Sequence, residues 1–170
     1  NSGMVDSSAV ILTGDHGCAY FQQDKHLLND SRTHVELSIL HPDQKGFSDQ
    51  RMVNLGVDFA PTLLDIVGLT MPTEDGKIIT QNKGFVPRKY VISESVFRDK
   101  YKASVRTQNI SFFITCQYDI STKTIFFNKN FTSSLFDVSK GKITNWEQSS
   151  WLDSGNHLIQ VAKDHLQNNA

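Results

Sequence analysis

The chain has 170 residues and a mass of 19.2 kDa, enough for one domain with a substantial core and rather little for two. Its 17 Lys and Arg against 18 Asp and Glu give a net charge of -1, so there is no electrostatic reason to expect nucleic acid or an anionic membrane as a partner. A composition that is 38% hydrophobic and 21% charged is typical of a soluble globular protein. No apolar run approaches the roughly 20 residues of a membrane helix. The cysteines, Cys18 and Cys116, define no disulfide scaffold.

The first half of the chain has the pattern of two strands and a helix. The apolar run 10–13 predicts a short buried strand, and the alternation at 35–40 predicts a second strand. A polar segment of about twenty residues separates them, and a long loop between core strands is often functional. The clearest helix is expected at 58–67, with Pro61 in its first turn and Gly68 as its stop signal.

The second half has a different texture. Four short segments are rich in Val, Ile, Phe, Tyr and Thr and are separated by turn residues, which predicts an antiparallel meander; they are 89–95, 102–107, 111–118 and 122–128. A last strand is expected at 135–138 and an amphipathic terminal helix at 157–166. We therefore expect two regions, an α/β region at 1–88 and an antiparallel β subdomain with a terminal helix at 89–170.

The candidate chemistry lies directly after the first predicted strand. Asp15 and His16 stand between Gly14 and Gly17, where a carboxylate and an imidazole could bind a divalent metal ion. An adjacent Asp-His pair is a weak motif, and the alternative is a plain turn in which Asp15 caps a helix and His16 lies on the surface. Lys25 could hold an anionic substrate, although a lone lysine in a polar loop is usually just solvated.

Several pieces resemble one family in their order. Residues 6–17 (DSSAVILTGDHG) resemble the strand and metal-binding turn of sulfatases, in the alkaline-phosphatase superfamily. Residues 33–42 (THVELSILHP) are similar to the strand that follows there, 57–69 (VDFAPTLLDIVGL) to the next helix, and 135–138 (LFDV) to a stretch near the end of the C-terminal subdomain. The Asp-His turn and the Thr-His-Val strand resemble iduronate-2-sulfatase-like members more than arylsulfatases with Asp-Asn. The resemblance implies an α/β fold: the C-terminal part of an alkaline-phosphatase-like sandwich, a small antiparallel β subdomain and a terminal helix.

The resemblance also implies a reaction, the hydrolysis of a sulfuric ester by a formylglycine nucleophile made from a Cys/Ser-x-Pro-x-Arg motif. A divalent cation would assist, most often Ca2+, with Zn2+, Mg2+ or Mn2+ possible. Asp15 would be a metal ligand, and His16 would complete the coordination or contact the sulfate. Lys25 would match the sulfate-binding lysine, although the loop is short and lacks the family's Gly-Glu-His-Gly element. The implied substrate is a sulfated small molecule or glycan, and the implied location is secreted, lysosomal or periplasmic.

No Cys/Ser-x-Pro-x-Arg motif occurs in the 170 residues. We therefore expect the C-terminal portion of a sulfatase that is inactive alone, leaves an apolar face exposed and needs the missing N-terminal half or a partner chain. Nucleic acid and membrane are not expected as partners. Two alternatives stay open: a metal-dependent phosphatase or phosphoethanolamine transferase of the same superfamily, and a non-catalytic remnant or β-rich interaction module. Zinc would favour the first alternative, and absence of metal the second.

Overall fold

A computed structural model of the chain describes residues 7–17, 28–42, 51–73, 75–80, 86–126, 131–137, 141–143, 147 and 152–168. The chain divides into two compact units, each described here by itself. Unit 1 comprises Asn1–Asp15 and Val35–Lys89, and unit 2 comprises His16–His34 and Tyr90–Ala170. Within the described residues, no helix has both the length and the apolar character needed to cross a membrane.

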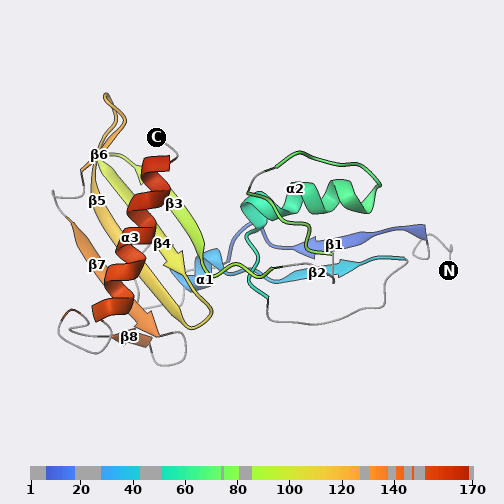
Figure 1. The fold of residues 1–170 in the computed structure, drawn as a ribbon, viewed down its shortest axis with the longest axis horizontal. Helices are drawn as coiled ribbons and strands as arrows, with labels where there is room; N and C mark the ends of the chain where they lie inside the picture. Colours follow the sequence, from blue (N-terminus) through green and yellow to red (C-terminus); the bar gives the residue numbers. More distant parts are fainter. Residues whose placement is uncertain are drawn as a thin grey trace. The chain divides into compact units, whose positions relative to one another are not determined.

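In the residues that the structure describes, unit 1 contains a two-stranded antiparallel sheet and one long helix (Figure 1). Strand β1 is Val10–Thr13, as predicted, and it pairs with β2, Leu37–Leu40, so that Val10 lies opposite Leu40 and Thr13 opposite Leu37. The helix α2 is Leu55–Ile66. Because paired residues of a sheet share a face, Ile11 and Ile39 lie on one face and Val10 and Leu40 on the other.

Helix α2 confirms the predicted element but corrects its start. The helix begins at Leu55 because the side chain of Asn54 caps it, accepting a hydrogen bond from the backbone N–H of Gly56 at 3.1 Å. Pro61 therefore lies inside the helix and not in its first turn. The expected stop is confirmed: Gly68 has a φ of +74°, a conformation that glycine adopts without a steric penalty, and Leu69 N–H bonds back to the Leu64 carbonyl at 2.8 Å.

Unit 2 is built on a six-stranded antiparallel sheet with the order β3-β4-β5-β7-β8, in which β6 also pairs with β5. The expected meander is confirmed, and the strand bounds are β3 Val91–Phe97, β4 Lys100–Arg106, β5 Ile110–Asp119, β6 Thr124–Phe126, β7 Thr132–Asp137 and β8 Gly141–Ile143. Strand β8 and the short helix α1, Asp30–Thr33, were not expected from the sequence.

One face of this sheet packs against the terminal helix α3, Leu152–Asn168, which lies across it in Figure 1. The register places Ala103 opposite Ile114 and Val105 opposite Phe112, so these apolar side chains share the face. They form a buried cluster whose other members are Tyr101, Cys116, Leu135, Leu158, Val161 and Ala162. The amphipathic helix predicted at 157–166 is thus confirmed, and its apolar stripe contributes three of the ten members of this buried cluster.

Candidate functional site

Asp15 and His16 lie in an exposed bend directly after β1. The bend is positioned by the end of the strand pair, where Thr13 lies opposite Leu37. The hydroxyl of Thr13 adds a side-chain bond, donating to the carbonyl oxygen of Glu36 at 2.8 Å. Asp15 and His16 are both exposed, and they follow β1 closely in the chain, as the sequence predicted.

The ring of His16 has a defined polar contact. Its Nδ1 lies 2.8 Å from the carbonyl oxygen of Gly17. A carbonyl oxygen can only accept, so Nδ1 is the nitrogen that carries the proton, and in the neutral ring the lone pair is then on Nε2. Metal-binding histidines commonly hold the second nitrogen in this way, because a bond to a backbone carbonyl fixes both tautomer and ring orientation.

Gly17 and helix α1 approach each other closely in unit 2. The N–H of Gly17 donates to the carbonyl of Arg32 at 2.9 Å, and a Cβ at position 17 would lie only 1.9 Å from the carbonyl oxygen of Ser31. Only glycine fits there. The glycine next to His16 is thus required by packing, which is a structural reason for the Asp-His-Gly spacing in addition to any chemical one.

Helix α1 is itself fastened to the sheet of unit 2. The carboxylate of Asp30 accepts a hydrogen bond from the hydroxyl of Ser111 at 2.7 Å and pairs with Nε of Arg106 at 3.4 Å. Asn29, the residue before the helix, is buried, and its side chain accepts a hydrogen bond from the hydroxyl of Ser31 at 2.9 Å. These contacts fix the backbone against which Gly17 packs.

The structure does not place the other candidate residues of the site next to Asp15 and His16. Lys25, the candidate sulfate contact, lies outside the described residues, as does Cys18. Among the residues that the structure does describe, no three His, Cys, Asp or Glu side chains converge on a point that could hold a metal ion. Within the described residues, Asp15 and His16 would therefore supply only part of the ligands that a metal site needs.

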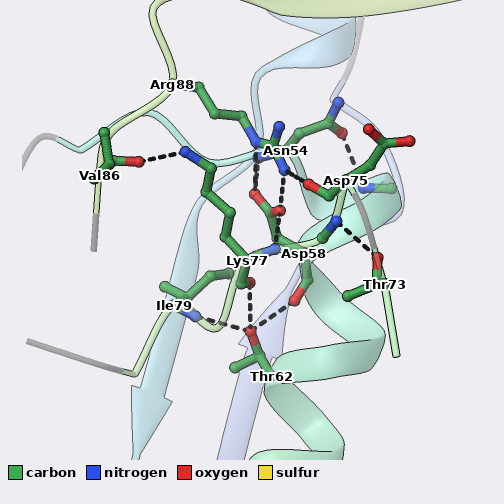
Figure 2. Close-up of polar contacts among 11 residues, drawn as sticks. Asn54, Asp58, Thr62, Thr73, Asp75, Lys77, Ile79, Val86 and Arg88 are labelled. Carbon is green, nitrogen blue, oxygen red and sulfur yellow. Dashed lines mark hydrogen bonds and ion pairs between the residues drawn. The ribbon is translucent and has the colours of Figure 1, made fainter. Parts of the chain in front are cut away.

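Unit 1 contains a buried polar cluster around Asp58 that was not expected from the sequence. Asp58, with no solvent exposure, accepts from the backbone N–H groups of Asn54 at 2.7 Å and Lys77 at 2.8 Å and from the guanidinium of Arg88 (Figure 2). Thr62, one turn later on α2, donates to the Asp58 carbonyl at 2.6 Å and accepts from Ile79 N–H at 3.0 Å. This cluster ties residues 75–80 and Arg88 to α2, and its buried, saturated carboxylate suits it for structure and not for binding a ligand.

A second polar cluster lies in unit 2, between the sheet and α3. Glu94 on β3 accepts a hydrogen bond from the hydroxyl of Tyr101 on β4 and lies 2.9 Å from Nε2 of His165 on α3. Burial, followed by the bond and charge of Glu94, raises the pKa of Tyr101 well above its usual range. Burial likewise raises the pKa of the Cys116 thiol to about 11. Both groups are protonated at neutral pH, and the buried Cys116 is therefore not an activated nucleophile.

Comparison with known proteins identifies the fold. No protein-family model matches the sequence. The structure matches that of a 2-O GAG sulfatase with a TM-score of 0.66 and 18% sequence identity over 94% of this chain. It also matches a protein assigned as a sulfatase from Bacteroides thetaiotaomicron VPI-5482 with a TM-score of 0.60 and 20% identity over 94% of this chain. The chain spans 36% and 35% of the length of these two structures, about a third of each. Its mixed α/β organisation, with antiparallel sheets and a C-terminal helix, is thus that of the C-terminal part of a sulfatase fold.

Proposed function

We propose that this chain is the C-terminal portion of a sulfatase-type hydrolase and contributes Asp15 and His16 to a divalent metal site, with Ca2+ as the metal. The observation that carries the proposal is the position of the Asp-His pair. It lies in an exposed bend at the end of β1, within a chain whose fold matches sulfatases over 94% of its length. The carboxylate of Asp15 is a hard oxygen ligand of the kind that Ca2+ prefers.

His16 supports the same proposal through its tautomer. With Nδ1 bonded to the Gly17 carbonyl, the neutral ring has its lone pair on Nε2, the form in which a histidine binds a metal ion or accepts a proton. A bound divalent cation would offset the negative charge that accumulates on sulfuryl oxygens during ester cleavage. The proposed role of this chain is to hold that cation and to orient the sulfate, with Lys25 as a further sulfate contact.

The proposed nucleophile lies outside these 170 residues, because they contain no Cys/Ser-x-Pro-x-Arg motif from which formylglycine could be made. We propose that an N-terminal portion of the same enzyme supplies it, so that the isolated chain does not turn over sulfate esters. One neighbour is described as a 2-O GAG sulfatase, which makes a sulfated glycan the substrate class to examine first. The same proposal includes the finer assignment, an iduronate-2-sulfatase-like enzyme, which sulfate release from 2-O-sulfated uronate disaccharides would test. By the same family resemblance, we propose a secreted, lysosomal or periplasmic enzyme.

The test uses the native-length gene product, purified from its source or expressed from the complete gene. Metal content and sulfate release from 2-O-sulfated uronate disaccharides are measured for the parent protein and for Asp15→Asn and His16→Gln. Asp75→Asn is the matched control, because Asp75 is an exposed carboxylate of unit 1 whose backbone carbonyl, and not its side chain, contacts Arg88. We expect about one Ca2+ per chain in the parent protein and in the control, because the proposal places a single site with an oxygen ligand, of the kind that Ca2+ prefers, in each chain.

Asp15→Asn should lose both the metal and the activity, and His16→Gln should lower sulfate release at least tenfold. Unchanged metal content and turnover in Asp15→Asn would disprove the proposal. Zinc in place of calcium, with release of phosphate from phosphate esters, would instead select the phosphatase or transferase alternative.

A further inference from the structure

The β1–β2 sheet of unit 1 has one apolar face that none of the described residues covers. Val10, Leu12 and Leu40 have exposed fractions of 48%, 71% and 49%. The register puts Val10 opposite Leu40 and Leu12 opposite Ser38, so all of these side chains project from the same face. Within strands β1 and β2 this face has three large apolar side chains, Ser38 and no charged residue, which is the composition of a core layer and not of a solvated surface.

The opposite face of the same sheet is partly covered, since Ile11 and Ile39 are both half-buried. There Ile11 lines a pocket of about 490 Å3 together with Leu63, Ile66 and Val67 of the α2 region. Strand β1 pairs only with β2 among the described strands, and β2 pairs only with β1, so each has one open edge within that part of the chain. Two strands with one covered face are marginal as an independent sheet, and stable α/β sheets are covered on both faces.

The length of the matched structures indicates what covers the exposed face. Almost all of this chain, 94%, aligns with each of two sulfatase structures, yet it spans only 36% and 35% of them. The larger part of each such fold is therefore made by chain that has no counterpart in these 170 residues. We infer that the Val10–Leu12–Leu40 face is the docking surface for this N-terminal portion of the enzyme, which lays an apolar layer on the face and adds a strand at an open edge. The inference rests on the proposed function, because the proposed function identifies the partner as the N-terminal portion of a sulfatase-type enzyme.

The inference has a physical consequence for β1. A strand that gains a neighbour on its edge and a layer on its face has its backbone N–H groups withdrawn from solvent. The amides of Val10–Thr13 should exchange hydrogen at least tenfold more slowly in the native-length product than in the 170-residue chain. Exchange in β4 of unit 2, already paired on both sides, should be the same in both proteins. Equal exchange of the β1 amides in the two proteins would overturn the inference.

Photocrosslinking identifies the occupant directly. A benzophenone amino acid replaces Leu12 in the native-length product, and the control replaces Ile120, which is 64% exposed in the turn directly after β5. We expect the crosslinks from position 12 to map by mass spectrometry to a segment N-terminal to residue 1 of the same polypeptide, and those from position 120 not to. Crosslinks from position 12 to a second copy, to another protein or to nothing would each overturn the inference.

The two experiments also separate this inference from the proposed function. Sulfate release by a protein that gives no crosslink from position 12 would leave the function intact and disprove the docking surface. The expected crosslink in a protein that binds no metal and cleaves no sulfate ester would confirm the surface and disprove the function.

Discussion

Arg88 donates from its guanidinium to both carboxylate oxygens of Asp58, a side chain that has no exposure to solvent. Two backbone N–H groups, from Asn54 and Lys77, complete the shell of donors around the carboxylate. A buried charge is tolerated only when it is paired and fully hydrogen-bonded, and here four donors satisfy it. Arg88 also donates to the Asp75 carbonyl, so one guanidinium joins the helix start to the loop that follows it.

Loss of either partner in this pair should destabilise unit 1. Arg88→Met leaves the Asp58 carboxylate buried without its counterion, which typically costs about 3–5 kcal/mol. Asp58→Ala removes the acceptor for the N–H groups of Asn54 and Lys77 and should cost a similar amount. Hydrogen exchange of residues 73–80 measures the effect, because this segment is fastened through Asp58 and Thr62.

The double variant Asp58→Asn with Arg88→Met tests the cause. Because the two side chains interact, the double variant should lose less free energy of unfolding than Asp58→Asn alone and Arg88→Met alone lose together. Additive costs would show that the two side chains act independently, against the structure. Asp75→Asn, whose side chain makes none of these contacts, should leave the exchange of residues 73–80 unchanged.

The stability of unit 1 should also depend on the absence of a side chain at Gly76. A Cβ at position 76 would lie 2.5 Å from the Val57 carbonyl oxygen and 2.8 Å from the ring of Pro61. Gly76→Ala should therefore cost about 1–3 kcal/mol, the usual range for overpacking. Gly56→Ala is the control, since its nearest contact is the Asn54 side chain at 3.3 Å and alanine favours a helix. Urea unfolding followed by the far-UV signal measures both, and an unchanged midpoint for Gly76→Ala would contradict the close packing.

The sequence predicted those features that depend on neighbouring residues. A short apolar run identified β1, the alternation of side chains identified β2, and residues that favour strands identified most strands of unit 2, while Gly68 identified the end of α2. The role of Asp58 depends on residues 19 and 30 positions away, at Lys77 and Arg88, and no local pattern contains that information. Helix α1 was missed for the same reason, because its four residues are held by Ser111 and Arg106 of the sheet and not by their own periodicity.

In the candidate site, too, the sequence predicted what depends on adjacent residues and missed what depends on distant ones. The Asp15-His16 pair was visible because both residues follow a strand directly in the sequence. The reason for Gly17 was not visible, since it depends on the carbonyl of Ser31, which only the fold brings close. Asp15 and His16 could be predicted as neighbours because they are adjacent in the sequence, whereas no group of three potential metal ligands is found among the described residues.

Unit 2 should lose stability in alkaline solution. Burial raises the pKa of Cys116 from 9.0 to about 11, so above pH 9 the unfolded chain releases a proton that the folded chain retains. The stabilisation from this group is complete below pH 9 and is lost as the pH rises toward 11. The pKa of Tyr101 is raised in the same direction, which steepens the decline above pH 10.

Urea unfolding of the 170-residue chain at pH 8 to 11, followed by the near-UV signal, measures this decline. The loss of stability with pH should be smaller in Cys116→Ala and in Tyr101→Phe than in the parent chain, although each variant starts from a lower value at pH 8. A midpoint that does not change with pH in the parent chain would rule out the buried neutral state of both groups.

The contact between His165 and Glu94 predicts a small effect on α3. Both side chains are about a third exposed, at 34% and 36%, so water screens their interaction. His165→Ala should cost no more than about 1 kcal/mol, in the range of exposed ion pairs. Faster amide exchange near the end of α3, with no change for the exposed His157→Ala, is the expected observation. A loss of several kcal/mol would show that His165 has a role in the core that the structure does not assign to it.

Gly17→Ala should disturb the Asp15-His16 turn without touching either candidate ligand. The added Cβ would lie 1.9 Å from the Ser31 carbonyl oxygen, a distance that no side chain can tolerate, so the backbone next to His16 must shift. That shift breaks the bond from Gly17 N–H to the Arg32 carbonyl and moves the carbonyl that fixes the His16 ring. In the native-length product we expect calcium affinity to fall at least tenfold in calorimetric titration, the size of effect that misplaced supporting groups have on metal sites. Gly56→Ala, far from the turn in sequence, should bind calcium as the parent does. Undiminished affinity in Gly17→Ala, combined with faster exchange at residues 13–17, would mean that the turn moved and the metal is held elsewhere.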